Sequence, residues 1–304
     1  MRELYLQQAK LLVELLPHVA GEPSLALKGG AAINMFVRDL PRISVDIDLT
    51  YVPVAARPAS LDGISRALRS IASRMKRLLS GIEVREKCSE GFARTLYVSR
   101  GSVVVKLEPN TILRGTLLPS QPRTLSTAVN VKLGTESHVL AATLSFDELY
   151  AGKICAALDR QHPRDLFDIW LLLSNEGLTE GVRRAFVVYL AASDRPMHEL
   201  LAPQAKPLPP ASVSELAGMT DVGVSVDDLT VAWESLVRQI REGLSPNERR
   251  FLLSLKHGEP EWDLLGFPDL ERLPALQWKL TNIRRMAPGK RADAEAKLKA
   301  VLGL

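Results

Sequence analysis

Cysteine is scarce in this chain: two occur among 304 residues, Cys88 and Cys155. Two cysteines cannot build a disulfide framework, and their spacing excludes a Cys-x-x-Cys metal site, so a reducing compartment is expected. No apolar run reaches the roughly 18 residues of a membrane span, and the first residues lack the apolar core of a signal peptide. We therefore expect a cytoplasmic protein without membrane contact.

Signatures of several common enzyme classes are also missing. The chain has no Gly-x-Ser-x-Gly motif and no Walker-type phosphate loop, and its five histidines show no metal-ligand spacing. The charge is mildly basic, formally +4, which permits a nucleic-acid partner without requiring one. With 46% hydrophobic and 24% charged residues, the composition suits one large globular domain or two of moderate size.

The stretch from Leu27 to Tyr51 carries the strongest indication of chemistry. From Val45 onward it is expected to be a strand, and a period of two places Asp46 and Asp48 on the same face, about 6.6 Å apart. Two carboxylates at this spacing favour a shared cation, and hard oxygen ligands beside a phosphate substrate suit Mg²⁺. An exposed strand with two solvated acids is the alternative.

The same stretch opens with Lys28-Gly29-Gly30, a turn before an expected short helix at residues 31–38. Glycine lets the backbone approach a ligand closely, and the first N–H groups of a helix lack internal partners, so the turn is a candidate anion site. An ordinary tight turn is the alternative. The turn and the Asp-x-Asp strand together are more specific than either motif alone.

This stretch resembles the AbiEii/MenT group of nucleotidyltransferase toxins, in the form GG…RxSxDIDL with Gly29-Gly30, Ser44, Asp46 and Asp48. The resemblance implies a minimal nucleotidyltransferase fold of the DNA polymerase β kind. It implies that Asp46 and Asp48 hold Mg²⁺. It also implies that the Lys28-Gly29-Gly30 turn and Ser44 bind the outer phosphates of a nucleoside triphosphate.

A third carboxylate falls on a neighbouring strand. Strands are expected at residues 82–87, 92–99 and 102–108, and in the last of these Lys106 and Glu108 share a face. An acid beside the acceptor hydroxyl would serve as base or metal ligand in nucleotidyl transfer. The alternative is a strand-end glutamate that only pairs with Lys106. The resemblance implies the catalytic role, although an aspartate is commoner there.

Two helices carry the remaining candidates. A capping box at Ser145 predicts a helix with Lys153 in the middle of an apolar stripe. This lysine either extends to solvent or meets nucleotide phosphates as a compact cation. The next helix starts near Pro163 and embeds Asp168 among apolar residues, where a carboxylate needs a partner. That partner is either Arg164 at i, i+4 or Lys153 across the helix hairpin.

A second block of the AbiEii/MenT pattern coincides with this hairpin. In that group the lysine and the last aspartate of the block are functionally required, which implies catalytic roles for Lys153 and Asp168 and phosphate binding by Lys153. The block has the spacing DE-x4-K-x6-R-x3-RD-x2-D and comprises Asp147, Glu148, Lys153, Arg160, Arg164, Asp165 and Asp168.

The expected fold class is α+β. An amino-terminal nucleotidyltransferase-fold lobe, with a mixed sheet flanked by helices, precedes an all-helical carboxy-terminal lobe. The prolines of the stretch PQAKPLPP mark the boundary, so the predicted domains are residues 1–202 and 203–304. A helix at residues 2–16 is expected to end at Pro17, and residues 110–136 show no clear period. Further helices are expected at 60–79, 178–201, 211–218, 226–243, 245–256, 274–286 and 292–302.

The sequence thus predicts a monomeric, Mg²⁺-dependent nucleotidyltransferase toxin. By resemblance it transfers a nucleoside monophosphate from a nucleoside triphosphate to RNA, at the 3′ end of tRNA, and blocks translation. The resemblance also implies a separate antitoxin protein. Two alternatives stay open: an acceptor that is a protein side chain or a small molecule such as an aminoglycoside, and a non-catalytic RNA- or protein-binding module on the same fold.

Overall fold

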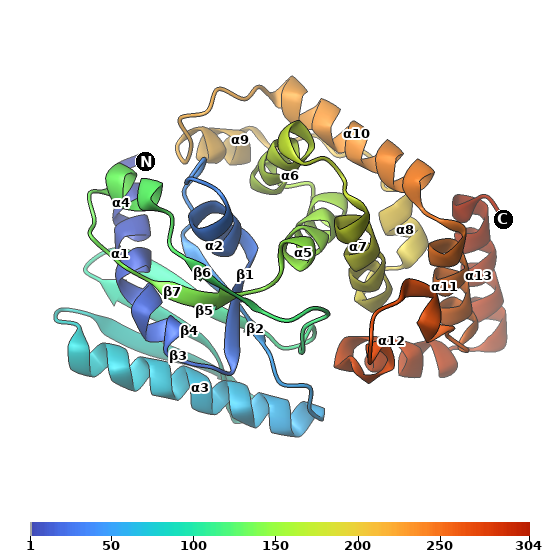
Figure 1. Cartoon of the computed structure of the whole chain (residues 1–304), viewed down its shortest axis with the longest axis horizontal. Helices are drawn as coiled ribbons and strands as arrows, with labels where there is room; N and C mark the ends of the chain where they lie inside the picture. Colours follow the sequence, from blue (N-terminus) through green and yellow to red (C-terminus); the bar gives the residue numbers. More distant parts are fainter. Residues whose placement is uncertain (1) are drawn as a thin grey trace. The chain divides into compact units, whose positions relative to one another are not determined.

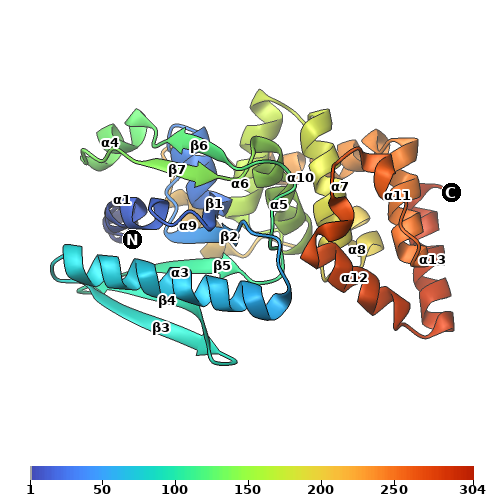
Figure 2. The same cartoon turned by 60° about the horizontal axis from the view of Figure 1, so that its bottom comes forward.

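The computed structural model describes residues 2–304 (Figures 1 and 2). The chain packs as two compact units. The first comprises the residues up to Ser145 together with Ser214–Gly223, and the second comprises Phe146–Val213 with Val224–Leu304. The predicted domains, a nucleotidyltransferase core at residues 1–202 and a helical lobe at residues 203–304, stay a prediction. The compact units have other limits, because the helices from residue 146 onward pack with the carboxy-terminal helices.

A seven-stranded sheet forms the centre of the first unit, in the order β3-β4-β5-β2-β1-β7-β6. β2 pairs parallel with β5, as β1 does with β7, and the other neighbours are antiparallel. This mixed sheet confirms the predicted fold class. The strands are β1 (Leu25–Lys28), β2 (Asp46–Tyr51), β3 (Glu83–Ser89), β4 (Phe92–Arg100), β5 (Val103–Asn110), β6 (Gln121–Thr124) and β7 (Leu140–Thr143).

The two faces of the sheet differ in burial. One face packs under α1 (Arg2–Ala20) and α3 (Arg57–Leu78), and Figure 2 shows α3 lying along β4. Apolar side chains of the strands point toward these helices. Because side chains alternate along a strand, the residues between the apolar ones project from the opposite face. That opposite face carries Asp46, Asp48 and Glu108. The buried face contains Leu27, Ile47, Leu49, Leu96, Val98, Val105 and Leu107.

The first helix continues past Pro17, so the predicted end at that residue is wrong. α1 extends to Ala20 with Pro17 inside it. A proline removes one N–H from the helix ladder, and here the loss falls in the last turn, where Val19 is still buried. The carbonyl of Pro17 accepts a hydrogen bond from Gly21 N at 3.2 Å, which closes the helix.

Residues 110–136 contain two elements that the sequence pattern did not reveal. β6 is a four-residue edge strand, and Pro122 lies within it. Prolines are tolerated in edge strands because an edge leaves some N–H groups without ladder partners. α4 (Thr127–Leu133) begins after Ser126, whose side chain accepts from Ala128 N, and ends at Gly134 in the left-handed conformation. Both elements are too short to produce a period.

The second unit is helical, in agreement with the prediction (Figure 1). The stretch 203–209 has no regular structure, and α9 (Pro210–Ala217) runs across the limit between the units. Within residues 2–304, no helix has both the length and the apolar character of a membrane span. The other helices are α5 (Phe146–Asp159), α6 (Pro163–Asn175), α7 (Glu180–Ala192), α8 (Met197–Leu201), α10 (Val226–Gly243), α11 (Pro246–His257), α12 (Pro274–Arg284) and α13 (Pro288–Leu302).

Candidate active site

Three carboxylates of the first unit lie on one face of adjacent strands. In the parallel pair of β2 and β5, Asp46 is the register partner of Lys106, and Asp48 is the partner of Glu108. Neighbours in register project from the same face of a sheet. The structure therefore brings Asp48 and Glu108 side by side, although 60 positions separate them in the sequence.

Lys106 occupies this carboxylate face in the structure. Its Nζ lies 2.6 Å from Glu108 Oε2, which is the pairing that the sequence left open as an alternative. Burial disfavours its charge. The hydrogen bond to Glu108 and the charges of Glu108, Asp46 and Asp48 outweigh burial and raise the pKa of Lys106. The face thus attracts a positive charge.

The donor set suits a hard cation. In residues 2–304, no three His, Cys, Asp or Glu side chains already gather closely enough to hold a metal ion together. Asp46 and Asp48 nevertheless project from one face of β2, with Glu108 in register with Asp48. Carboxylate oxygens are the protein ligands that Mg²⁺ takes, and it uses one or two of them beside substrate phosphates. These residues fit Mg²⁺.

The glycine turn closes directly on Asp48. Gly29 has φ +65°, and a Cβ placed there would lie 2.3 Å from Asp48 Oδ2. A Cβ on Gly30 would lie 2.9 Å from Ser44 Oγ and 3.1 Å from Arg42 Nη2. A residue with a side chain would therefore collide at either position. Close packing is the reason for both glycines, and it places the turn against Asp48 and Ser44.

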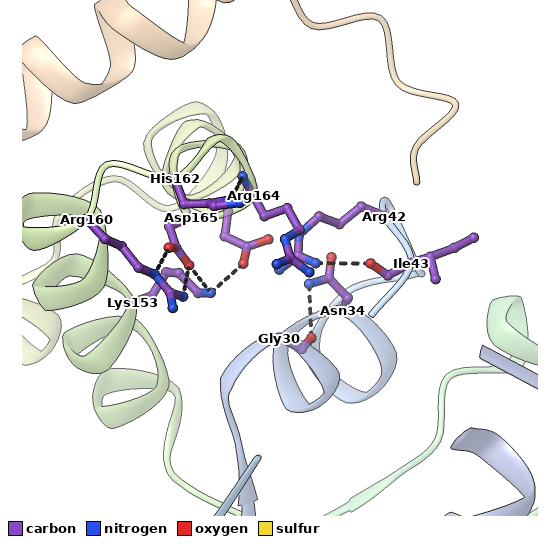
Figure 3. A network of polar contacts seen from close by, with 10 residues as sticks. Gly30, Asn34, Arg42, Ile43, Lys153, Arg160, His162, Arg164 and Asp165 are labelled. Atoms are coloured by element: carbon purple, nitrogen blue, oxygen red, sulfur yellow. Dashed lines mark hydrogen bonds and ion pairs between the residues drawn. The ribbon is translucent and has the colours of Figure 1, made fainter. Parts of the chain in front are cut away.

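The helix after the turn begins earlier than predicted. α2 (Gly29–Ala32) starts at the first glycine and continues into a π-helical turn, Ile33–Val37. Within it Asn34, fully buried, donates from Nδ2 to the carbonyl oxygen of Gly30 at 3.0 Å (Figure 3). A π-helical turn is frequent at functional sites, and this one holds the backbone of the glycine turn.

Arg42 is a feature of this region that the sequence interpretation passed over. The residue is 3% exposed, and its side chain packs against Gly30 and donates to the carbonyl oxygen of Ile43 at 3.0 Å (Figure 3). The strand-like segment around it is held by Thr220, which forms a bridge with Arg42. The alternation of Arg42 with Ser44 and Asp46 was the available signal. Arg42 adds a fixed positive charge beside the glycine turn.

The second unit contains a buried ionic cluster. Lys153 Nζ on α5 lies 2.9 Å from Asp165 Oδ1 and 2.9 Å from Asp168 Oδ2, both on α6. The side chains of Lys153, Asp165 and Asp168 are 7%, 2% and 0% exposed. The pairing of Lys153 with Asp168 across the hairpin is thus confirmed, and the alternative that Lys153 extends to solvent is wrong.

Asp165 is the member of this cluster that the sequence did not identify as a partner. Arg160 donates to it from Nε and from Nη2, in addition to the contact with Lys153 (Figure 3). Burial opposes its charge, but Lys153 and Arg160 outweigh burial and hold the pKa of Asp165 well below its usual range. Its position three residues before Asp168, on the same helix face, was the available signal.

A known protein family matches most of this chain. The family described as "Nucleotidyl transferase AbiEii toxin, Type IV TA system" matches residues 10–282 of the chain. The chain belongs to this AbiEii family. Membership confirms the resemblance drawn from the two motif blocks and makes the protein a nucleotidyltransferase toxin of the family.

Two solved structures resemble this chain. The nucleotidyltransferase toxin MenT4 from Mycobacterium tuberculosis matches with a TM-score of 0.56 and 18% identity, over 99% of this chain and 99% of its own. JHP933 from Helicobacter pylori matches with a TM-score of 0.45 and 15% identity, over 79% of this chain and 93% of its own. Comparison with curated protein sequences gave no match. The likeness to MenT4 shows the fold.

Proposed function

We propose that this AbiEii protein transfers a nucleoside monophosphate from a nucleoside triphosphate to the 3′ end of tRNA in the cytoplasm. The modified tRNA no longer accepts an amino acid, so translation stops. One observation carries the proposal: the register of β2 and β5 sets Asp48 beside Glu108 on the face against which the Gly29 turn closes. Phosphoryl-group transfer depends on positioning and charge, and this face supplies both.

In this proposal Asp46 and Asp48 hold Mg²⁺ together with Glu108. When bound, the ion neutralises charge on the triphosphate. The turn Lys28-Gly29-Gly30 and Ser44 bind the outer phosphates, and the buried Arg42 adds positive charge beside them. Glu108 exchanges its contact with Lys106 for the acceptor hydroxyl and takes the proton of that hydroxyl. The hydroxyl oxygen bonds to the α-phosphorus, the bond from that phosphorus to the β-phosphate oxygen breaks, and pyrophosphate leaves.

We assign Lys153 and Asp168 to the same reaction. Two carboxylates within 2.9 Å of Nζ favour the protonated ammonium. Lys153 then stabilises negative charge that develops on the transferred phosphoryl group. Asp168 orients Lys153 and acts through it. This assignment rests on the motif that the family shares and on the burial of the cluster.

The proposed partners follow from the family. A type IV toxin–antitoxin system implies a separate antitoxin protein, and we propose that the toxin itself acts as a monomer. An acceptor that is a protein side chain or a small molecule, or a binding role without catalysis, would each give a different outcome in the experiment below.

The decisive experiment is incubation with total tRNA, Mg²⁺ and each α-³²P-labelled nucleoside triphosphate in turn. Label on tRNA that Asp48→Asn abolishes would support the proposal and name the nucleotide. The matched control is Asp62→Asn on α3, whose side chain is 56% exposed and forms a surface pair with Arg66. Label on protein instead of RNA would contradict the tRNA acceptor. No label with folded protein and the full tRNA pool would contradict the enzyme.

A further inference from the structure

A buried arginine in the first unit has two guanidinium nitrogens without a hydrogen-bond acceptor among the described residues. Arg114, in the loop after β5, is 7% exposed, and its Nε and Nη1 are buried without a hydrogen-bond acceptor among residues 2–304. The backbone there is well held, because Gly115 N donates to the carbonyl oxygen of Tyr51 at 2.8 Å. A guanidinium stays charged in proteins, so burial without an acceptor is costly.

The charges around Arg114 are of the same sign. Burial lowers its pKa, and the positive charges of Arg57 and Arg94 lower it further, while no carboxylate of the described chain offsets them. Arg94 also has a buried Nε without an acceptor in the part of the chain that the structure describes. Glu90 serves the other two arginines, at 3.2 Å from Arg57 and 3.0 Å from Arg94. Glu90 is thus shared by Arg57 and Arg94, and no carboxylate of the described residues offsets their charge at Arg114.

The start of α3 adds to this positive field. The helix begins at Arg57 and has 22 residues, and its first turn, which lies wholly within the described chain, contains no acidic residue. The first N–H groups of a long helix attract anions. The side chain of Arg57 is 57% exposed. The cluster is therefore open to solvent through Arg57 and buried at Arg114.

We propose that Arg57, Arg94 and Arg114 form a phosphate-binding site, and that the phosphate belongs to the backbone of the RNA acceptor. Guanidinium groups are the preferred partners of phosphate oxygens. The assignment of this phosphate to RNA rests on the proposed function. β5 presents Glu108, and the chain reaches Arg114 six residues later, beside the end of β2. Tyr51, whose carbonyl oxygen accepts from Gly115 next to Arg114, lies three strand residues from Asp48, or about 10 Å.

The first test measures the site by thermal unfolding, without activity. Wild type, Arg114→Met and Arg66→Met are unfolded at equal ionic strength in sodium chloride or in sodium phosphate. Arg66 is the matched control, because it lies on α3 with a side chain 75% exposed. We expect phosphate to raise the Tm of wild type and of Arg66→Met, and to leave Arg114→Met unchanged.

The same experiment separates anion binding from a structural role. In chloride, Arg114→Met should unfold at or above the wild-type Tm, because the change removes a buried charge that lacks an acceptor. A marked fall in Tm in chloride would show that Arg114 is needed for folding and would overturn the site. An equal response of wild type and Arg114→Met to phosphate would overturn it as well.

The second test asks whether the phosphate comes from RNA. Binding of an acceptor-stem hairpin to wild type and Arg114→Met is measured at several salt concentrations. We expect Arg114→Met to bind about tenfold more weakly and to reduce the salt slope by about one, with nucleotide binding unchanged. If phosphate raises the Tm of wild type but Arg114→Met binds RNA as well as wild type does, the site binds a free anion, and the assignment of the phosphate to RNA is wrong. If no RNA is labelled by the wild type while the phosphate response persists, the proposed function fails and the anion site stands.

Discussion

Lys153 Nζ lies 2.9 Å from both Asp165 Oδ1 and Asp168 Oδ2, and the three side chains are at most 7% exposed. Removing one partner of a buried ion pair leaves an uncompensated charge, at a cost of about 3–5 kcal/mol. A charged group can be kept in such a place when it serves a reaction, which is the role that we propose for Lys153.

Lys153→Met should therefore lower both activity and stability. We expect a loss of about 3 kcal/mol in the free energy of unfolding and at least a hundredfold loss of nucleotidyl transfer, from the missing positive charge. Urea unfolding and the labelling assay check the two effects. The control is Lys299→Met, which removes an exposed helix pair with Glu295. Its stability should stay within about 0.5 kcal/mol of wild type.

Asp165 predicts how stability depends on acid. Its pKa is lowered in the folded state from an ordinary value of 3.8, so its stabilisation is complete above the unfolded pKa and is lost as the pH falls below it. Wild type and Asp165→Asn should thus differ in free energy of unfolding by a constant amount above about pH 5, and converge as the pH falls further. Denaturant titrations between pH 7 and pH 3 check this. A difference that does not change with pH would refute it.

Lys279 predicts a dependence of the same sign at alkaline pH. Burial, and then the charge of Lys256, lower the pKa of Lys279 to about 8 from an ordinary value of 10.5. Between these values the unfolded chain binds more protons, so stability rises with pH in that window. Relative to Lys279→Met, the free energy of unfolding of the wild type should rise by on the order of 1 kcal/mol per pH unit from pH 8 to pH 10. Thermal melts of both proteins across this range would show a parallel course if the prediction is wrong.

Gly29→Ala should impair the glycine turn. The residue has φ +65°, and the added methyl group would lie 2.3 Å from Asp48 Oδ2. We expect a stability loss of about 1–3 kcal/mol and a large fall in nucleotide affinity, because the turn can no longer close on Asp48. Gly223→Ala in the same unit is the control, since its Cβ meets no atom within 4 Å. Equal nucleotide binding by the two variants would contradict the assigned role of the turn.

Lys106→Met tests the carboxylate face as a cation site. The Nζ atom of Lys106 lies 2.6 Å from Glu108 Oε2 and is attracted by the negative charges of Asp46 and Asp48. Its removal should raise the affinity for Mg²⁺ several-fold, because a competing positive charge is gone. Calorimetric titration without nucleotide measures this directly, and Lys87→Met, on the exposed edge strand β3, is the control. Weaker Mg²⁺ binding by Lys106→Met would mean that the lysine organises the ligands instead.

Much of the candidate site could be predicted because its rules are local. Alternation along one strand is enough to place Asp46 and Asp48 on the same face. Helical spacing and the start at Pro163 are enough to place Asp165 and Asp168 on one face of α6. The same local rules misplaced the end of α1 at Pro17, because a proline in the last turn costs a helix only one bond.

Tertiary structure decided the contacts between distant segments. The register that sets Asp48 beside Glu108, the partners of Lys153 across the hairpin, and the bridge from Thr220 that holds Arg42 all join residues far apart in the chain. Burial also had to be seen, since an arginine in a loop is ordinary until Arg114 proves to be 7% exposed. Sequence by itself determined which side chains share an element and a face. Packing determined which faces meet, because sheet register and burial depend on the whole chain at once.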